Sequence, residues 1–146
     1  MFLSRLLDSL RKLLRVKQHN IEQLRQQMAL LNNQIELRLH AIQKNISYIN
    51  TERLIASVNI NGADTLEAFV GKKLAENKRY AKESEELKET VSKIQEQLFE
   101  AYTEQKQFEK VQEHEQTRIN TDLQSKENQE MDEMATQMYL SNLNKI

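Results

Sequence analysis

The sequence contains no cysteine, no proline and no tryptophan, and it has only two glycines among its 146 residues. Without cysteine, the chain can form no disulfide, and it offers neither a thiolate ligand for zinc nor a thiol nucleophile. Folds with many tight turns need glycine, proline or Asn-Gly sequences where the chain reverses. The scarcity of these residues, together with a regularly spaced apolar fraction of 38%, predicts long helices.

Long apolar runs are also missing from the sequence. No run approaches the roughly 20 residues that a membrane-spanning helix needs. The leucines near the start are interrupted by Arg5, Asp8, Arg11 and Lys12, which is not typical of a signal peptide. The net charge of −1 predicts no nucleic-acid partner. We therefore expect a cytoplasmic protein with no direct membrane insertion.

Only residues 57–64 carry strong turn signals. Asn61-Gly62 favours a reversal of the chain, and Asp64 with Glu67 three residues later forms a capping box for a following helix. Heptad patterns lie on both sides of this segment. We predict an all-α fold, in which two long helices form an antiparallel coiled-coil hairpin. The expected helices span about 3–56 and about 65–140, with a turn at 57–64 and a frayed tail at 141–146.

Apolar residues define the expected seam of the first helix. They are Ile21, Leu24, Met28, Leu31, Ile35, Leu39, Ile42, Ile46 and Ile49. Two successive four-residue steps, from Leu31 through Ile35 to Leu39, predict a stutter that locally unwinds the supercoil. The seam of the second helix follows a heptad frame from Leu66 to Phe108. Polar residues occupy part of this frame, namely Lys73, Asn77, Ser84 and Gln105.

The second helix is predicted to be longer than the first and to overhang it from about Ile119. Met131, Met134 and Met138 lie on one face of this overhang. Methionine suits adaptable docking surfaces, and no intramolecular partner is expected there. We expect this face to dock on another protein, with self-association or fraying as the alternatives.

The first 17 residues combine a dense leucine face with five basic residues and a single acidic one, Asp8. One interpretation is that the leucines pack on the second helix. The alternative is a basic amphipathic helix that docks in a partner groove or on a membrane surface. A second basic stretch, residues 72–82, is expected to be a solvated face, and contact with an acidic partner is its alternative.

No pattern of catalytic or metal-binding residues is present. His19, His40 and His114 have no second ligand at a recognised spacing, and the glutamates at 83–89 are expected to be a solvated face. The sequence also has no glycine-rich phosphate loop and no serine elbow. We predict no catalytic residue, no metal site and no cofactor, and therefore no enzyme activity.

The segment Glu130-Met131-Asp132-Glu133-Met134-Ala135 is similar to a signature near the C-terminus of the FliJ family, in which Met-Asp-Glu is followed by an aromatic or apolar residue and then Ala. The length and layout of the whole chain also resemble this family, although Glu127-Asn128-Gln129 departs from its pattern. FliJ proteins are small cytoplasmic coiled-coil components of bacterial flagellar protein export. Their relatives are stalk proteins of virulence type III secretion.

This resemblance implies several partners within the export apparatus. They are the hexameric export ATPase with its regulator, the cytoplasmic domain of the export gate, and export chaperones. The location implied is the cytoplasm, in peripheral association with the inner membrane. The residues implied in ATPase docking are Met131, Asp132, Glu133, Met134 and Met138. Those implied in gate contact are Tyr48, Ile49, Phe69 and Leu74.

Three alternatives remain at this point. The chain could be the equivalent stalk of a virulence secretion system, a generic coiled-coil scaffold or tether, or a membrane-surface helix protein. A prefoldin-like clamp would need strands near the turn, and the sequence predicts none.

Overall fold

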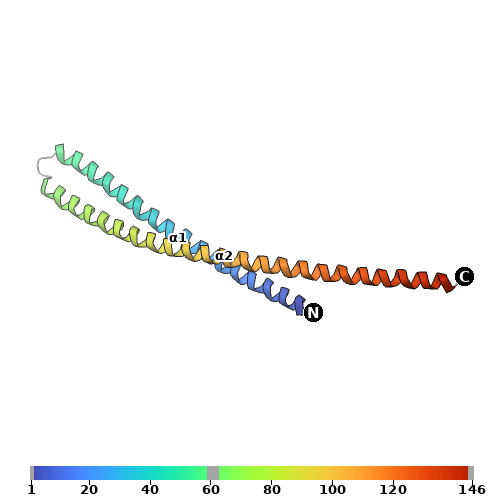
Figure 1. Ribbon diagram of the computed structural model, residues 1–146. Helices are drawn as coiled ribbons and strands as arrows, with labels where there is room; N and C mark the ends of the chain where they lie inside the picture. Colours follow the sequence, from blue (N-terminus) through green and yellow to red (C-terminus); the bar gives the residue numbers. More distant parts are fainter. Residues whose placement is uncertain (1, 59–62, 145–146) are drawn as a thin grey trace. The chain divides into compact units, whose positions relative to one another are not determined.

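The computed structural model describes residues 2–58 and 63–144, which form two helices. Helix α1 comprises Phe2–Val58 and helix α2 comprises Ala63–Asn144. They pack against each other as a hairpin, and α2 is the longer helix, with 82 residues against 57 (Figure 1). The predicted all-α hairpin with a longer second helix is therefore confirmed.

The helices extend beyond the predicted boundaries. Helix α1 ends at Val58 instead of near Ala56, and α2 begins at Ala63. Asp64 therefore lies within the first turn of α2 instead of preceding it as an N-cap, and there its carboxylate complements the positive end of the helix dipole. Residues 141–144 belong to α2, where a frayed tail was predicted. The Asn61-Gly62 turn lies outside the described residues.

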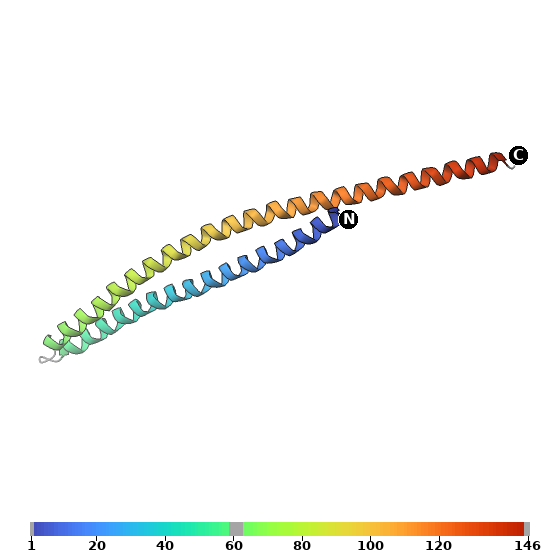
Figure 2. The same ribbon diagram turned by 90° about the horizontal axis from the view of Figure 1, so that it is seen from below.

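One compact part of the chain, residues 20–101, contains the closely paired stretches of both helices (Figures 1 and 2). Its core is Ile21, Ile94 and Leu98, against which four partly buried side chains pack: Leu24, Met28, Leu31 and Ala101. Burying an aliphatic side chain of this size is worth about 1.5–3 kcal/mol. This cluster therefore holds α1 and α2 together where the predicted seam of α1 begins.

The predicted frame of the second helix is confirmed. Every frame position from Leu66 to Phe108 is buried or half-buried, including the polar ones. The same frame continues to the half-buried Gln112, the buried Glu115 and the half-buried Ile119. A constant period of seven thus predicted which face of α2 meets α1.

The predicted stutter in the first helix is wrong. Leu39 and Ile46 are exposed, at 44% and 42%, whereas Arg38 is half-buried and Asn45 is only 5% exposed. Arg38 and Asn45 take the places in the seam that were predicted for Leu39 and Ile46. The steps along the seam therefore alternate between three and four residues throughout. No local unwinding is needed, because the polar residues maintain the heptad period that the apolar pattern breaks.

Hydrogen bonds across the helix pair compensate for the two polar seam residues of α1. Arg38 Nε donates to Glu83 Oε2 at 2.8 Å. Asn45 Nδ2 donates to Asn77 Oδ1 at 2.8 Å and to Glu76 Oε2 at 3.2 Å. A buried polar group is costly only when it lacks such a partner, so these contacts allow polar residues to face α2.

The other compact part contains residues 1–19 and 102–146. In this part Leu7 and Leu10 are buried, which supports the packing interpretation of the N-terminal leucines. The Lys17 ammonium pairs with the carboxylate of Glu104 and lies 6.0 Å from the centre of the Phe108 ring. Polar contacts thus supplement a seam that is less apolar here than in residues 20–101.

Helix α2 continues beyond the stretch that is paired with α1, and none of the described residues packs over this last part. All positions from 120 to 144 are exposed. The predicted overhang is therefore present, and it leaves a long helical surface open to a partner.

Candidate partner-binding surfaces

The C-terminal stretch of α2 carries exposed methionines on one face. Met131, Met134 and Met138 are between 63% and 68% exposed. Their spacing of three and four residues places them side by side on a helix. We call these three residues the methionine face. Thioether side chains are flexible and polarisable, so such a face can adapt to the contours of a partner.

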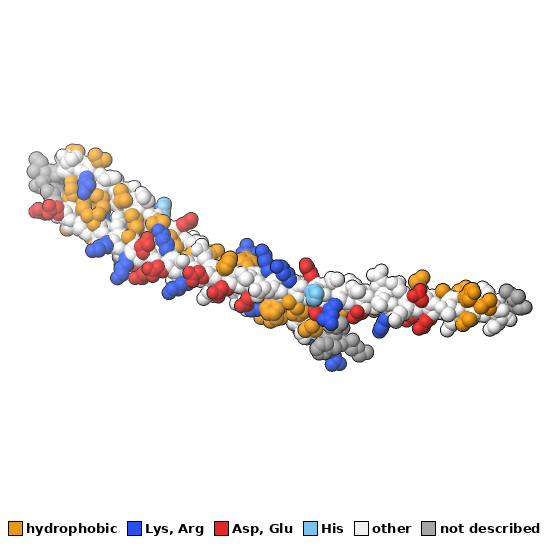
Figure 3. Space-filling view, viewed as in Figure 1, with side chains coloured by type: hydrophobic (Ala, Val, Ile, Leu, Met, Phe, Trp, Pro, Cys, Tyr) orange, Lys and Arg blue, Asp and Glu red, His pale blue; other side chains and the backbone are white. Residues whose placement is uncertain are grey.

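Carboxylates and further apolar residues surround the methionine face. Asp132 and Glu133 are exposed. Four more large apolar residues of this stretch are exposed, Leu123, Tyr139, Leu140 and Leu143, and Figure 3 shows hydrophobic side chains gathered near the end of α2. The five residues predicted to dock on an ATPase thus lie on one accessible helical segment.

A second candidate surface lies near the ends of α1 and α2 that the turn connects. The Lys73 ammonium lies 5.7 Å from the centre of the Tyr48 ring and 5.6 Å from that of the Phe69 ring. It also forms an ion pair with Glu76 Oε2 at 3.5 Å. We call Tyr48, Phe69 and Lys73 the hairpin-end surface. Cation–π attraction holds the two rings and the ammonium together as one amphipathic patch.

The other two predicted gate residues have different environments. Leu74 is 54% exposed and follows Lys73 directly. Ile49 is only 5% exposed, because it occupies a seam position of α1. Ile49 therefore supports the neighbouring Tyr48 from within the helix pair and does not itself line the surface.

Sequence reasoning missed three exposed apolar residues at the end of α1: Leu54, Ile55 and Val58. Ile55 lies seven residues after Tyr48, and Val58 lies three residues after Ile55, so all three share a helix face. This spacing was visible in the sequence. The three residues lie outside the apolar stripe that forms the seam, so the periodicity of the seam does not identify them.

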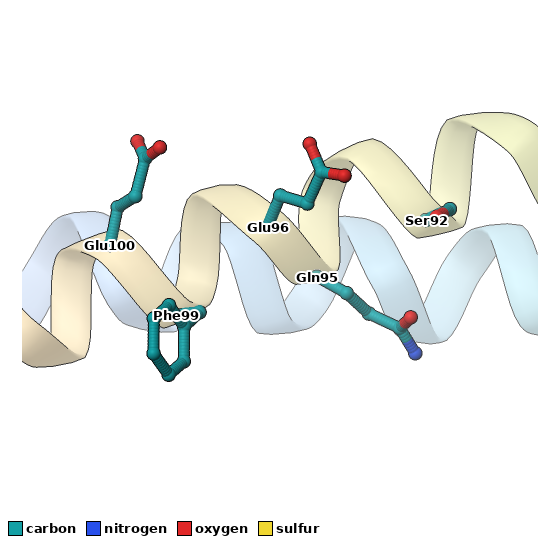
Figure 4. A pocket seen from close by; sticks show the side chains of 5 residues that line it. All are labelled: Ser92, Gln95, Glu96, Phe99 and Glu100. Atoms are coloured by element: carbon teal, nitrogen blue, oxygen red, sulfur yellow. The ribbon is translucent and has the colours of Figure 1, made fainter.

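Two surface hollows in the described part of the chain are each formed by a single helix. One hollow is lined by Ser92, Gln95, Glu96, Phe99 and Glu100, and all five belong to α2 (Figure 4). Another is lined by four residues of α1, Gln26, Ala29, Leu30 and Asn33. A hollow formed by one helix is a shallow indentation and cannot enclose a substrate.

The three histidines and most of the basic stretch are exposed. His19, His40 and His114 all lie on the surface, and the described residues contain no group of three potential metal ligands. In the basic stretch, Arg79 lies over the Tyr80 ring at 5.1 Å and pairs with Glu83 at 3.7 Å. Lys73 alone in this stretch spans two aromatic rings, which distinguishes it from a purely solvated lysine.

Comparison with known families gives a match that extends over nearly the whole chain. The family model described as Flagellar FliJ protein matches residues 6–144. The chain belongs to the FliJ family. The match includes both candidate surfaces, all of α2, and α1 from residue 6 onward. No curated protein and no solved structure matches the chain.

Membership of the FliJ family identifies the chain as a component of the flagellar export apparatus. This family is a non-catalytic part of that apparatus, and its partners lie within it. Neither helix, over its described residues, contains an apolar stretch that could span a bilayer.

Proposed function

We propose that this FliJ-family protein is a stalk-like coupling protein that binds the hexameric export ATPase with its regulator and the cytoplasmic domain of the export gate. Chaperone escort is part of the same proposed role. The protein itself carries out no chemistry, and it acts in the cytoplasm at the inner-membrane face of the export apparatus. The observation that carries the proposal is the exposed methionine face on the uncovered stretch of α2.

The methionine face with Asp132 and Glu133 is the proposed ATPase contact. An unpaired helical stretch is a suitable shape for insertion into a ring, because it presents side chains on all sides. A single asymmetric helix cannot contact six similar subunits equally. It can therefore favour nucleotide closure in some subunits over others, which is a coupling free energy between sites.

The hairpin-end surface, extended by Leu74, is the proposed gate contact. Aromatic residues dominate the binding energy of many interfaces, and Tyr48 and Phe69 are held in place by Lys73. If the gate domain binds this surface better in its active conformation, binding shifts the gate toward that conformation.

A direct binding experiment tests the ATPase part of the proposal. The full-length chain is expected to co-sediment with the export ATPase hexamer formed in the presence of a non-hydrolysable ATP analogue. The same chain should not co-sediment with bovine serum albumin at equal concentration. Failure to co-sediment at micromolar concentrations would contradict an ATPase-docking role.

A single substitution tests the gate part. Phe69→Ala is expected to weaken binding of the isolated gate domain by roughly tenfold, because it removes a partly exposed aromatic anchor. ATPase binding should change by less than about twofold, since residue 69 lies outside the methionine face. Phe99→Ala, which removes a 73% exposed ring elsewhere on α2, is the matched control. Equal loss of gate and ATPase binding by Phe69→Ala would refute the division of roles.

A further inference from the structure

Residues 35–49 of α1 contain two competing sets of seam residues. Both sets share Ile35, Ile42 and Ile49. The observed set adds Arg38 and Asn45, whereas the alternative set adds their neighbours Leu39 and Ile46. Each set advances by alternating steps of three and four residues, so both fit a coiled-coil seam.

Hydrophobic burial alone favours the alternative set. It would cover Leu39 and Ile46 and return Arg38 and Asn45 to water. The structure shows the reverse, because the two apolar residues are exposed at 44% and 42%, and Asn45 is buried. A specific interaction must therefore outweigh the loss of apolar burial.

The amide pair of Asn45 and Asn77 provides this interaction. Asn77 occupies the seam frame of α2, directly across from Asn45, and accepts its hydrogen bond at 2.8 Å. Asn45 also donates to Glu76, which in turn pairs with Lys73 at 3.5 Å. A rotation of α1 that placed Ile46 against Asn77 would break both hydrogen bonds of Asn45 and leave the Asn77 amide facing an aliphatic side chain.

Ser84 provides an internal comparison. It is also a polar seam residue of α2 and is 2% exposed, but its hydroxyl has no hydrogen-bond partner among the described residues. Ser84 therefore does not stabilise one orientation of α1 over the other through a hydrogen bond. The asparagine pair is therefore the main interaction that favours the observed set, and the contact between Arg38 and Glu83 favours the same set.

We propose that the Asn45–Asn77 pair selects which of these two sets of α1 residues faces α2, and that it thereby keeps Leu39 and Ile46 on the surface. Buried asparagines fix alignment in coiled coils because only one arrangement pairs them. Residues 35–49 are then a two-state element in which polar pairing opposes apolar burial. This inference depends on contacts within residues 20–101 and does not depend on which export component binds the protein.

The absence of native cysteine allows a direct test by thiol labelling. Leu39→Cys and Leu37→Cys are made as separate reporters in the full chain, since both leucines are exposed. Adding Asn77→Leu is expected to slow labelling of Leu39→Cys by roughly tenfold, because α1 rotates and buries this position. Labelling of Leu37→Cys should stay unchanged, because residue 37 lies away from both seams. Slowing of both reporters, or of neither, overturns the proposal.

Two further variants separate polar pairing from a general effect on packing. Asn77→Gln keeps an amide acceptor and should leave Leu39→Cys reactive, whereas slowing equal to that in Asn77→Leu overturns the proposal. Ser84→Ala removes a polar seam residue without a cross-helix hydrogen bond and should also leave it reactive. Asn77→Leu must retain the helical circular dichroism of the unsubstituted chain, because packing through the alternative set of seam residues keeps it folded. Loss of helicity in that variant also overturns the proposal.

Discussion

Replacing Ile21 by alanine is expected to lower the free energy of unfolding by about 2–5 kcal/mol, as large-to-small changes in a buried core do. Ile21 is 1% exposed and packs with Ile94 and Leu98 in the hydrophobic core of residues 20–101. A two-helix hairpin buries a single stripe, so few other contacts are available to compensate. Because small proteins are stable by only about 5–15 kcal/mol, this loss should be conspicuous.

Thermal denaturation followed by circular dichroism measures the effect. The matched control is Leu37→Ala, which removes the same kind of aliphatic side chain from a position that is 60% exposed. That change should alter the stability by no more than about 0.5 kcal/mol. Similar melting temperatures for the two variants would show that the cluster around Ile21 does not hold the hairpin together.

Replacing all three residues of the methionine face by alanine is expected to weaken binding to the export ATPase at least about tenfold, because buried side chains at an interface centre carry most of its energy. The expectation follows from the proposed docking role of Met131, Met134 and Met138. Alanine and methionine both favour helix, so the helical content should remain close to that of the unsubstituted chain. Isothermal titration with the assembled ATPase measures the binding.

A matched triple variant changes the opposite face of the same helical stretch. Ser125→Ala, Gln129→Ala and Thr136→Ala alter three exposed residues that lie away from the methionines. Thr136 donates only to the Asp132 carbonyl of its own helix, at 2.9 Å, so its loss should not disturb other elements. Undiminished binding by the methionine variant, or an equal loss of binding in the control variant, would show that the methionine face does not form the ATPase contact.

Much of the architecture could be predicted because one physical signal dominates the sequence. Chain reversals require particular residues, and their scarcity outside residues 57–64 limited the fold to two helices. The frame from Leu66 to Phe108 was predicted correctly because heptad period and burial agree along α2. The overhang followed from counting residues on either side of a short connection.

The seam of α1 could not be predicted in the same way. Following apolar residues alone selected Leu39 and Ile46, although Arg38 and Asn45 face α2. The deciding contacts join residues 31 to 45 positions apart in the sequence, and a periodic pattern within one helix contains no information about them. Ile49 was predicted to lie in this seam, and it is buried there. Its place among the gate residues was implied only by the family resemblance.

The hairpin-end surface is likewise a product of the tertiary structure. Phe69 and Lys73 are four residues apart on α2, so their contact belongs to a single helix. The contact between Lys73 and Tyr48 arises only where α1 and α2 are paired, and it brings the second ring to the surface. The methionine face, by contrast, belongs to a single helix, so its spacing could be read directly from residues 131–138.

Helical periodicity and the scarcity of turn residues are local properties, so they are enough to predict two long helices of unequal length. The packing of α1 against α2 selects the residues of α1 that are buried and the side chains that form a surface across the two helices. That decision depends on hydrogen bonds between distant residues, whose energy exists only once α1 and α2 lie against each other.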